Sequence, residues 1–179
     1  MLAYIKVLEN NKYLNLDKKS KLLYFKAYHF RISQNDSLSF IYHKKALDFA
    51  NEIKDSLTIL ASLSGLSQSK GYDGYNYRID YLNKLKTKAY EFNNHKFKIV
   101  ESFLRGNYYY LRDENIKASR YYNNVLKFKY RKQDSAYLVN TLNNLGALYN
   151  DNFQLPDSAN YYYKLKLKII NNNKIQKWL

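Results

Sequence analysis

The chain repeats one pattern, in which an aromatic residue is followed four positions later by a leucine. The pairs are Tyr81 and Leu85, Tyr122 and Leu126, and Tyr163 and Leu167, each 41 residues after the one before. His43 and Leu47 keep the same pattern 38 residues before the first of these pairs. Residues four apart lie on one face of a helix. Recurrence at a fixed interval of this length predicts a repeated helical unit.

A second row of small residues runs in step with the aromatic row. Its members, separated by 38, 41 and 40 residues, are Ala27, Gly65, Gly106 and Gly146. A residue with little or no side chain allows another part of the chain to approach closely. We therefore expect two helices in each unit, the first with a small residue at its middle and the second with the aromatic-leucine pair.

Only five glycines and one proline interrupt these patterns, which favours an all-helical chain. The dipeptide Asp-Ser precedes several apolar-periodic runs, and both residue types cap helix N-termini. The predicted caps are Asp36-Ser37, Asp55-Ser56, Asp134-Ser135 and Asp157-Ser158. The expected helices are 1–11, 18–33, 37–53, 56–70, 75–92, 95–112, 115–131, 135–151 and 157–171.

The last unit, "NTLNNLGALYNDNFQLPDSANYYYKLKL", resembles the tetratricopeptide repeat (TPR) family. Its matching residues are Leu145-Gly146, Tyr149, Ala159 and Tyr163, with one extra residue in the turn. The third unit matches at Gly106, Tyr109, Ala118 and Tyr122, and the first, more loosely, at Ala27, Phe30, Ser39, His43 and Ala46. The second keeps Gly65 and Tyr81. These units are similar to the long repeats in sensor segments of bacterial regulators.

The sequence also departs from the family pattern. The leucine before the small residue is replaced by Lys26, Ser64 and Arg105, and a small position in the second helix by Lys84 and Lys166. The period is about 40 residues, whereas the standard repeat has 34, so HEAT-like helical repeats remain a structural alternative.

The resemblance implies an all-α fold, a right-handed α-solenoid of about four stacked hairpins in a single domain, 1–179. The expected units are 18–53, 55–92, 95–132 and 134–171, with a partial helix at 1–16 and the start of a truncated continuation at 172–179. Packing between repeats is assigned to Ala27, Gly65, Gly106, Gly146, Tyr81, Tyr122, Tyr163, Leu47, Leu85, Leu126 and Leu167.

A concave groove lined by the first helices is the site that the resemblance implies. The candidate groove residues are Tyr24, Tyr28, Arg31, Phe103, Asn107, Tyr110, Asn140, Asn143 and Asn150. Asparagine can hydrogen-bond a peptide backbone from both ends of its amide, and tyrosine offers flat contact area. For the tyrosines, packing between repeats is the alternative role. We expect a peptide or protein partner, and a sensor or assembly segment of a larger regulatory protein.

The net charge of +15 has two explanations. It can reflect a polyanionic partner, which is nucleic acid, an anionic membrane surface or an acidic protein. It can also reflect a composition rich in Lys, Asn, Tyr, Ile and Phe, since the lysines are spread along the whole chain. Nucleic-acid binding is kept as the alternative function, with Lys127, Lys129, Arg131 and Lys132 clustered beside Tyr130. A purely structural role in a longer repeat protein is a third possibility.

Signatures of catalysis are missing from the sequence. The chain has no cysteine, and His29, His43 and His95 lack metal-ligand spacing. No glycine-rich phosphate loop and no nucleophile elbow is present. We therefore predict no enzyme activity, no metal and no cofactor. No apolar run is long enough to span a membrane, and a cytoplasmic location is expected.

Overall fold

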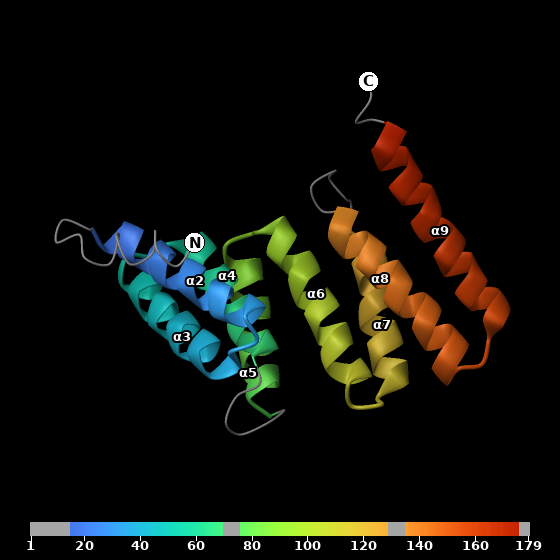
Figure 1. Ribbon diagram of the computed structural model, residues 1–179, viewed down its shortest axis with the longest axis horizontal. Helices are drawn as coiled ribbons and strands as arrows, with labels where there is room; N and C mark the ends of the chain where they lie inside the picture. Colours follow the sequence, from blue (N-terminus) through green and yellow to red (C-terminus); the bar gives the residue numbers. More distant parts are fainter. Residues whose placement is uncertain (1–14, 70–75, 129–134, 176–179) are drawn as a thin grey trace. The chain divides into compact units, whose positions relative to one another are not determined.

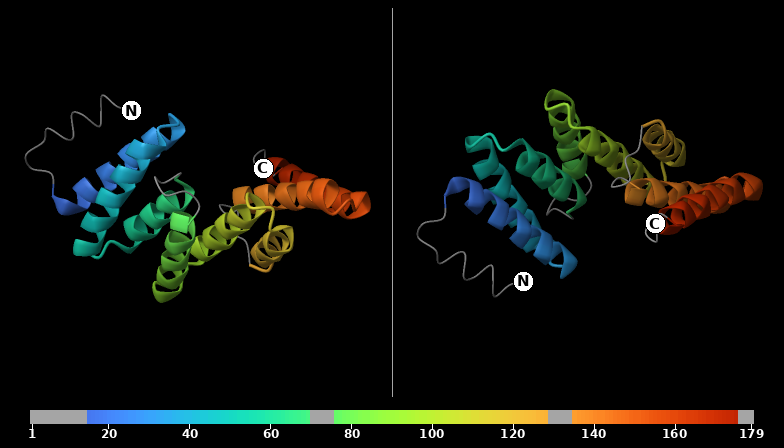
Figure 2. Two further views of the ribbon diagram at one scale, coloured as in Figure 1. Left: turned by 90° about the horizontal axis from the view of Figure 1, so that it is seen from below. Right: turned by 90° about the horizontal axis from the view of Figure 1, so that it is seen from above.

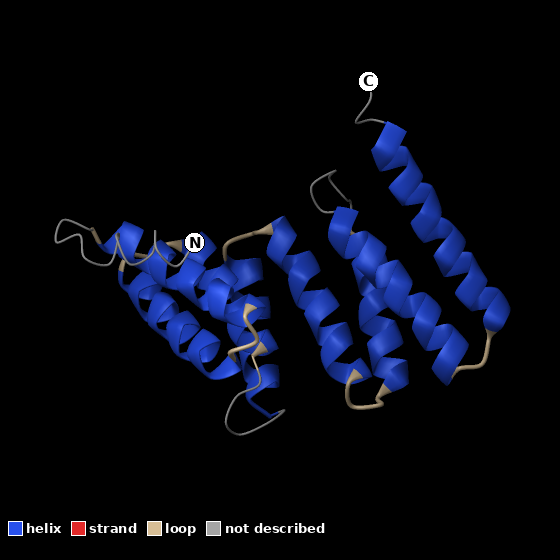
Figure 3. Ribbon diagram, viewed as in Figure 1, coloured by secondary structure: helices blue, strands red, loops and turns tan. Residues whose placement is uncertain are grey.

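A computed structural model describes residues 15–69, 76–128 and 135–175. Within these ranges the ordered elements are helices joined by short turns, and no strand is present (Figure 3). In chain order they are α2 (Leu16–Ile32), α3 (Asp36–Glu52), α4 (Ser56–Gln68), α5 (Asn76–Glu91), α6 (His95–Tyr110), α7 (Asn115–Leu126), α8 (Ser135–Ala147), the π-helical turn η2 (Leu148–Asn152) and α9 (Pro156–Ile175) (Figure 1). The all-helical prediction is confirmed for this part of the chain.

Two compact bodies divide the chain, at 1–97 and 98–179. In the N-terminal body α3 packs on both α2 and α4, and α4 packs on α5. In the C-terminal body α8 packs on α7 and on α9, as the views in Figure 2 also show. We call α2–α3 hairpin 1, α4–α5 hairpin 2, α6–α7 hairpin 3 and α8–η2–α9 hairpin 4. The expected helix at 1–11 and the basic cluster at 129–132 lie outside the described residues.

Asparagine, rather than the predicted Asp-Ser pair, caps several helix starts. The Oδ1 atom of Asn35 accepts a hydrogen bond from the Leu38 amide, so Asp36 lies inside the first turn of α3. Asn15 and Asn94 cap α2 and α6 in the same way. The Asp157 prediction is also wrong, because α9 begins at Pro156. Asp55 does cap α4, with Oδ1 3.1 Å from the amide nitrogen of Leu57.

Several helices are followed by a residue in the left-handed backbone conformation. The positive φ angles, between 46° and 57°, belong to Gln34, Lys54, Asn93, Asp113 and Gln154. Directly after Gln34, the amide of Asn35 donates to the Phe30 carbonyl oxygen at 2.8 Å, and Glu114 repeats this bond to Tyr109 at 3.0 Å. Such bonds satisfy the last carbonyl groups of a helix and reverse the chain sharply. Hairpins 1 and 3 therefore share one turn geometry.

Hairpin 4 accommodates its extra residue in the π-helical turn. The amide of Phe153 donates to the Leu148 carbonyl oxygen, five residues earlier, at 3.2 Å. A π-helical turn holds one more residue than an α-helical turn. This finding explains why Gly146 and Tyr163 are 17 residues apart, whereas Gly106 and Tyr122 are 16 apart.

The small-residue row meets the aromatic row in space. In hairpins 3 and 4 the ring of Tyr122 lies against Gly106, and the ring of Tyr163 lies against Gly146. The second unit differs, because Gly65 on α4 receives the ring of His43 from α3 in the preceding hairpin. Each glycine lies so close to a ring that a Cβ atom would collide with it. The predicted close approach between helices is present at all three glycines, but with a different partner at Gly65.

The interior of the C-terminal body is built on the same contacts. Its buried centre consists of Ala118, Tyr122, Leu145 and Leu148, with partly buried aromatic residues around it. Removing this apolar surface from water is the main force that joins hairpin 3 to hairpin 4. The right-handed superhelix and the single-domain organisation stay predictions.

Candidate functional site

Ring pairs join the first and second helices of three hairpins. The rings of Phe30 and Tyr42 stack with centroids 5.4 Å apart, and so do those of Tyr109 and Tyr121. In hairpin 4 the rings of Tyr149 and Tyr162 are 5.2 Å apart and tilted by 40°. The second unit has Gln68 and Asp80 at the same two positions, so it lacks both rings. These aromatic residues therefore serve packing within hairpins.

A cation lies over the second ring of the pair in hairpins 1 and 3. The Lys26 Nζ atom is 4.4 Å from the centroid of the Tyr42 ring, and the Arg105 Cζ atom is 5.6 Å from that of Tyr121. Both cations occupy the position where the TPR pattern that these units resemble has leucine. The positive charge is attracted to the electron-rich face of the ring. The departure from the family pattern thus has a physical reason, because the basic residue and the ring occur together.

Arg105 also forms an ion pair along α6. Its Nε atom is 2.5 Å from the Glu101 Oε1 atom, and both side chains are buried. A buried charge must be paired to be tolerated in a protein interior. Arg105 is therefore held in place by the Glu101 carboxylate and the Tyr121 ring, and has a structural role.

Asn107, expected in the groove, instead lies at a polar node between three helices. The Tyr122 hydroxyl on α7 donates to the Asn107 Oδ1 atom at 2.8 Å, and Asn144 Nδ2 on α8 donates to the same oxygen at 3.1 Å. Burial raises the pKa of Tyr122, which keeps its hydroxyl protonated as a donor. Sequence reasoning missed Asn144, because nothing in the pattern distinguishes it from the neighbouring Asn143.

The other aromatic candidates in the C-terminal body also pack inward. Phe103 and Tyr110 are half-buried and lie against the buried centre of that body. The ring of Phe103 meets the ring of Tyr137 on α8 edge-on, at 5.7 Å between centroids. The lining of the groove that the resemblance implies is therefore, on α6, largely occupied by contacts between hairpins.

The candidates of the N-terminal body are only partly exposed. Tyr24 is half-buried, its ring lies 5.7 Å from that of His43, and burial raises its pKa. The Arg31 guanidinium lies over the Tyr28 ring, at 5.0 Å from its centroid. Tyr28 is therefore the candidate on α2 whose ring is most accessible to a partner, with Arg31 covering one face.

The asparagine row of hairpin 4, which we define as Asn140, Asn143 and Asn150, is exposed. Its counterparts in hairpin 3, 40 residues earlier, are Val100, Phe103 and Tyr110, which are buried or half-buried. The same face thus changes from apolar to amide between consecutive hairpins. An exposed row of amides offers donors and acceptors to a polypeptide that lies along the helix.

A lysine from α9 bonds the middle residue of this row. The Lys166 Nζ atom donates to the Asn143 Oδ1 atom at 2.8 Å and lies 5.2 Å from the centroid of the Tyr163 ring. Its counterpart in hairpin 3 is Val125, which is fully buried. At the C-terminal end of the row, Asn150 Nδ2 donates to the Asp151 Oδ1 atom at 2.8 Å. The asparagine row and Lys166 together form the candidate site.

The remaining repeat-packing residues differ in how deeply they are buried. Ala27, Tyr81 and Leu85 are buried, whereas Leu47 and Leu126 are half-buried. Leu167, expected at a packing position, is 54% exposed.

No group of His, Cys, Asp or Glu residues suited to a metal ion is found in the described ranges. Within the same ranges, no helix combines the length and the apolar character needed to cross a membrane. Comparison with models of known protein families finds no match, and no curated protein is significantly similar in sequence.

Proposed function

We propose that the chain is a TPR-like, right-handed helical-repeat scaffold that binds a segment of a partner protein along the asparagine row. In this proposal it has no enzyme activity and acts as the sensor or assembly part of a larger regulatory protein. Helical repeats stack because one hairpin cannot bury its apolar face alone, and the stack presents an extended surface to partners.

One observation carries the proposal, namely the exchange of an apolar face for an exposed amide face in hairpin 4. Val100 is buried, and its counterpart Asn140 is exposed. Phe103 packs against α8, whereas its counterpart Asn143 faces outward and bonds Lys166. Amide groups on a rigid helix can satisfy polar groups of a partner without first ordering a loop.

Selection of peptides on the whole chain from a random displayed library tests this proposal. Peptides that bind should lose about tenfold or more in affinity when Asn140 and Asn143 are both replaced by alanine, since each buried amide contact contributes about 1 kcal/mol. Asn51→Ala, at an exposed position on α3, is the matched control and should leave affinity unchanged. Equal binding by the double variant and the original chain would refute the proposal.

Nucleic-acid binding is the alternative function, and the net charge of +15 supports it. A complex of this kind should weaken steeply as salt rises, because phosphate contacts release counterions. A gel-shift titration at low salt with single-stranded and duplex RNA and DNA checks this alternative, and absence of any complex would remove it.

A further inference from the structure

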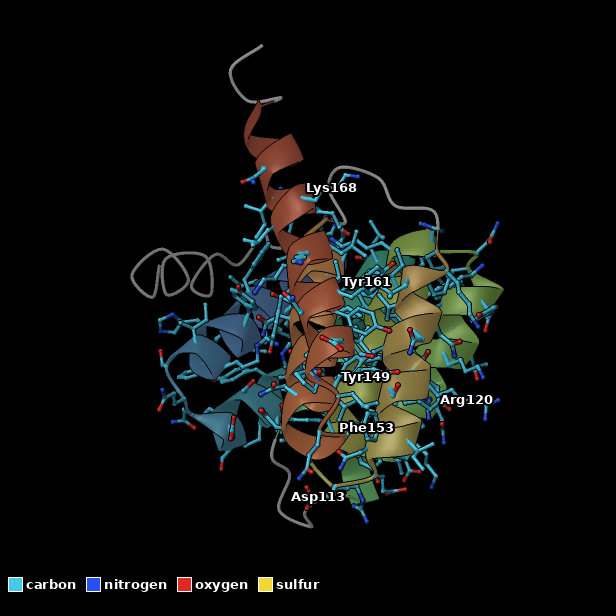
Figure 4. All side chains as sticks on the ribbon, turned by 90° about the vertical axis from the view of Figure 1, so that its right-hand side faces the viewer. Asp113, Arg120, Tyr149, Phe153, Tyr161 and Lys168 are labelled. Atoms are coloured by element: carbon cyan, nitrogen blue, oxygen red, sulfur yellow. The ribbon has the colours of Figure 1, made fainter. Side chains whose placement is uncertain are left out.

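Three tyrosines of hairpin 4 form a row of rings that leads from the surface toward the interior. Tyr161 on α9 is 63% exposed, and its ring meets that of Tyr162 edge-on, with centroids 5.4 Å apart. The half-buried Tyr162 ring lies 5.2 Å from the ring of Tyr149 in η2, at a tilt of 40°. Tyr149 and Tyr162 both pack against the buried centre of the C-terminal body. Figure 4 labels Tyr149 and Tyr161, the two ends of this tyrosine row.

The hydroxyl groups of Tyr149 and Tyr162 share a hydrogen bond, which determines how the two rings face each other. Burial raises the pKa of Tyr162 to about 12, and the Tyr149 hydroxyl adds to this effect. The carbon atoms ortho to a phenol hydroxyl flank the carbon that carries it. A bond between the two hydroxyls therefore brings an ortho carbon of one ring close to an ortho carbon of the other.

This contact suits one covalent reaction of phenols. A phenol that loses an electron and its hydroxyl proton becomes a neutral radical, with unpaired electron density on its oxygen and its ortho carbons. Two such radicals combine by forming a bond between ortho carbons. The hydrogen atoms on the joined carbons then move to the oxygens, which restores both hydroxyl groups and gives dityrosine. Groups that are already held in contact avoid most of the entropy cost of combining.

We propose that Tyr149 and Tyr162 are a site of oxidative modification, at which a peroxidase-type one-electron oxidant joins the two rings as dityrosine. The oxidant removes an electron and a proton from the exposed Tyr161, and Tyr161 regains both from its neighbours. The first electron and proton come from Tyr149 by way of Tyr162, and the second come from Tyr162 itself. One molecule of hydrogen peroxide accepts the two electrons and two protons, its O–O bond breaks, and two water molecules form.

The new bond links η2 covalently to α9, in the manner of a disulfide. A link of this kind limits the conformations open to the unfolded chain and so stabilises the fold. The chain has 21 tyrosines and no cysteine, so a disulfide cannot supply such a link. The inference goes beyond the proposed function, because it concerns the packing inside hairpin 4 and not the asparagine row.

Hairpin 3 contains a second ring pair, which provides an internal comparison. Tyr109 and Tyr121 stack with their centroids 5.4 Å apart. The counterpart of Tyr161, 41 residues earlier, is the exposed Arg120, and the third ring beside this pair, that of Tyr108, is buried. The two hairpins therefore match in the closeness of their rings and differ in the exposed tyrosine at which oxidation begins.

Treatment of the whole chain with a peroxidase and hydrogen peroxide tests the inference, at a low protein concentration that limits links between copies. The monomer is then digested and searched by mass spectrometry for two peptides joined with the loss of two hydrogen atoms. The peptides carrying Tyr149 and Tyr162 should be linked about fivefold more than those carrying Tyr109 and Tyr121. Oxidation of N-acetyltyrosine amide shows that the oxidant is active.

Three conservative variants test the residues. Tyr162→Phe removes the hydroxyl that bonds Tyr149 and should abolish the link. Tyr161→Phe should lower the yield of the link several-fold, because the exposed ring at which oxidation begins is lost. Tyr90→Phe is the matched control, because Tyr90 is 56% exposed on α5, and it should leave the yield unchanged. Far-UV circular dichroism checks that each variant folds.

Equal yields of the two links would overturn the inference. Absence of the link between Tyr149 and Tyr162, while the oxidant converts N-acetyltyrosine amide, would do the same. An unchanged yield in Tyr161→Phe would also overturn it, since oxidation would then not begin at the exposed ring. A higher thermal midpoint for the linked monomer than for the untreated chain is expected, and an unchanged midpoint would contradict the stabilising effect.

Discussion

The ring of Tyr122 lies directly over Gly106, with two ring carbons 2.5 Å from the place where a Cβ atom would stand. The two residues belong to the two helices of hairpin 3, so the glycine sets how closely those helices approach. The equivalent relationship between Tyr163 and Gly146 recurs in hairpin 4.

Gly106→Ala should therefore destabilise the C-terminal body by about 1–2 kcal/mol. The added methyl group displaces a fully buried ring, which outweighs the higher helix propensity of alanine. Urea denaturation measures the change. Adding Tyr122→Leu should give less than the sum of the two single effects, because the collision is then absent. A stabilising Gly106→Ala would contradict the close contact.

His43 should make the N-terminal body sensitive to acid. Burial lowers the pKa of His43 to about 4, the positive charge of Arg31 adds to this effect, and Tyr24 faces the ring without ionising in this range. In the unfolded chain a histidine has a pKa of about 6.5. The unfolded state therefore binds a proton that the folded state refuses as pH falls from about 6.5 to about 4.

The contribution of neutral His43 to the free energy of unfolding should thus be fully present above pH 6.5. It should fall by roughly 3 kcal/mol between about pH 6.5 and about pH 4 and change little below that. The difference between the original chain and His43→Phe, measured by thermal denaturation at each pH, isolates this contribution from the carboxylates. Parallel pH profiles for the two proteins would contradict the prediction.

Asn107→Leu should lower the free energy of unfolding by about 1–3 kcal/mol, because it leaves the buried Tyr122 hydroxyl without its main acceptor. Tyr122→Phe in the same background should recover part of this loss, since the orphaned hydroxyl is then removed. The double-mutant cycle is measured by chemical denaturation. Additive effects of the two substitutions would show that the bond contributes nothing.

Arg105→Leu should destabilise the chain by about 3 kcal/mol or more, although the TPR pattern that these units resemble has leucine at this position. The substitution leaves Glu101 buried without its partner on α6. Replacing Glu101 by leucine as well should restore most of the stability, because two apolar side chains can then pack together. Urea midpoints of the single and double variants decide the matter, and a neutral single variant would contradict it.

Gln34→Gly should raise the stability of hairpin 1 by about 0.5–1 kcal/mol. Gln34 has a φ of 57°, a conformation that glycine adopts without strain and that other residues do not. Ser33→Gly is the control, because its φ of −79° suits any residue and the change should bring no gain. Thermal midpoints compare the two, and a lower midpoint for Gln34→Gly would count against the assigned turn.

The spacing of two residue types was enough to predict the helical units, because residues four apart lie on the same face of any α-helix. The partner of each residue did not follow from that spacing. Gly65 and Tyr81 have the same separation as Gly106 and Tyr122, yet Gly65 receives the ring of His43. Contacts between helices depend on how each helix is rotated, and a repeat distance along the chain does not determine that rotation.

Helix starts were misplaced for a local reason. The run Asn35-Asp36-Ser37 offers three residues able to cap, and only the geometry of the turn selects the first. The asparagine row was identified from sequence and is exposed, whereas Phe103 and Asn107 pack inward. The sequence does not distinguish a helical face that binds a ligand from one that packs on a neighbouring helix. Only the structure shows which of these side chains are buried.

The π-helical turn at Leu148–Asn152 affects where the chain can accept insertions and deletions of residues. One inserted residue in a regular helix would swing everything after it by about 100°. Here the surplus is absorbed before α9 starts, and Tyr163 still reaches Gly146. Hairpin 4 therefore contains a turn in which residues can be inserted or deleted while the Tyr163 ring stays packed against Gly146.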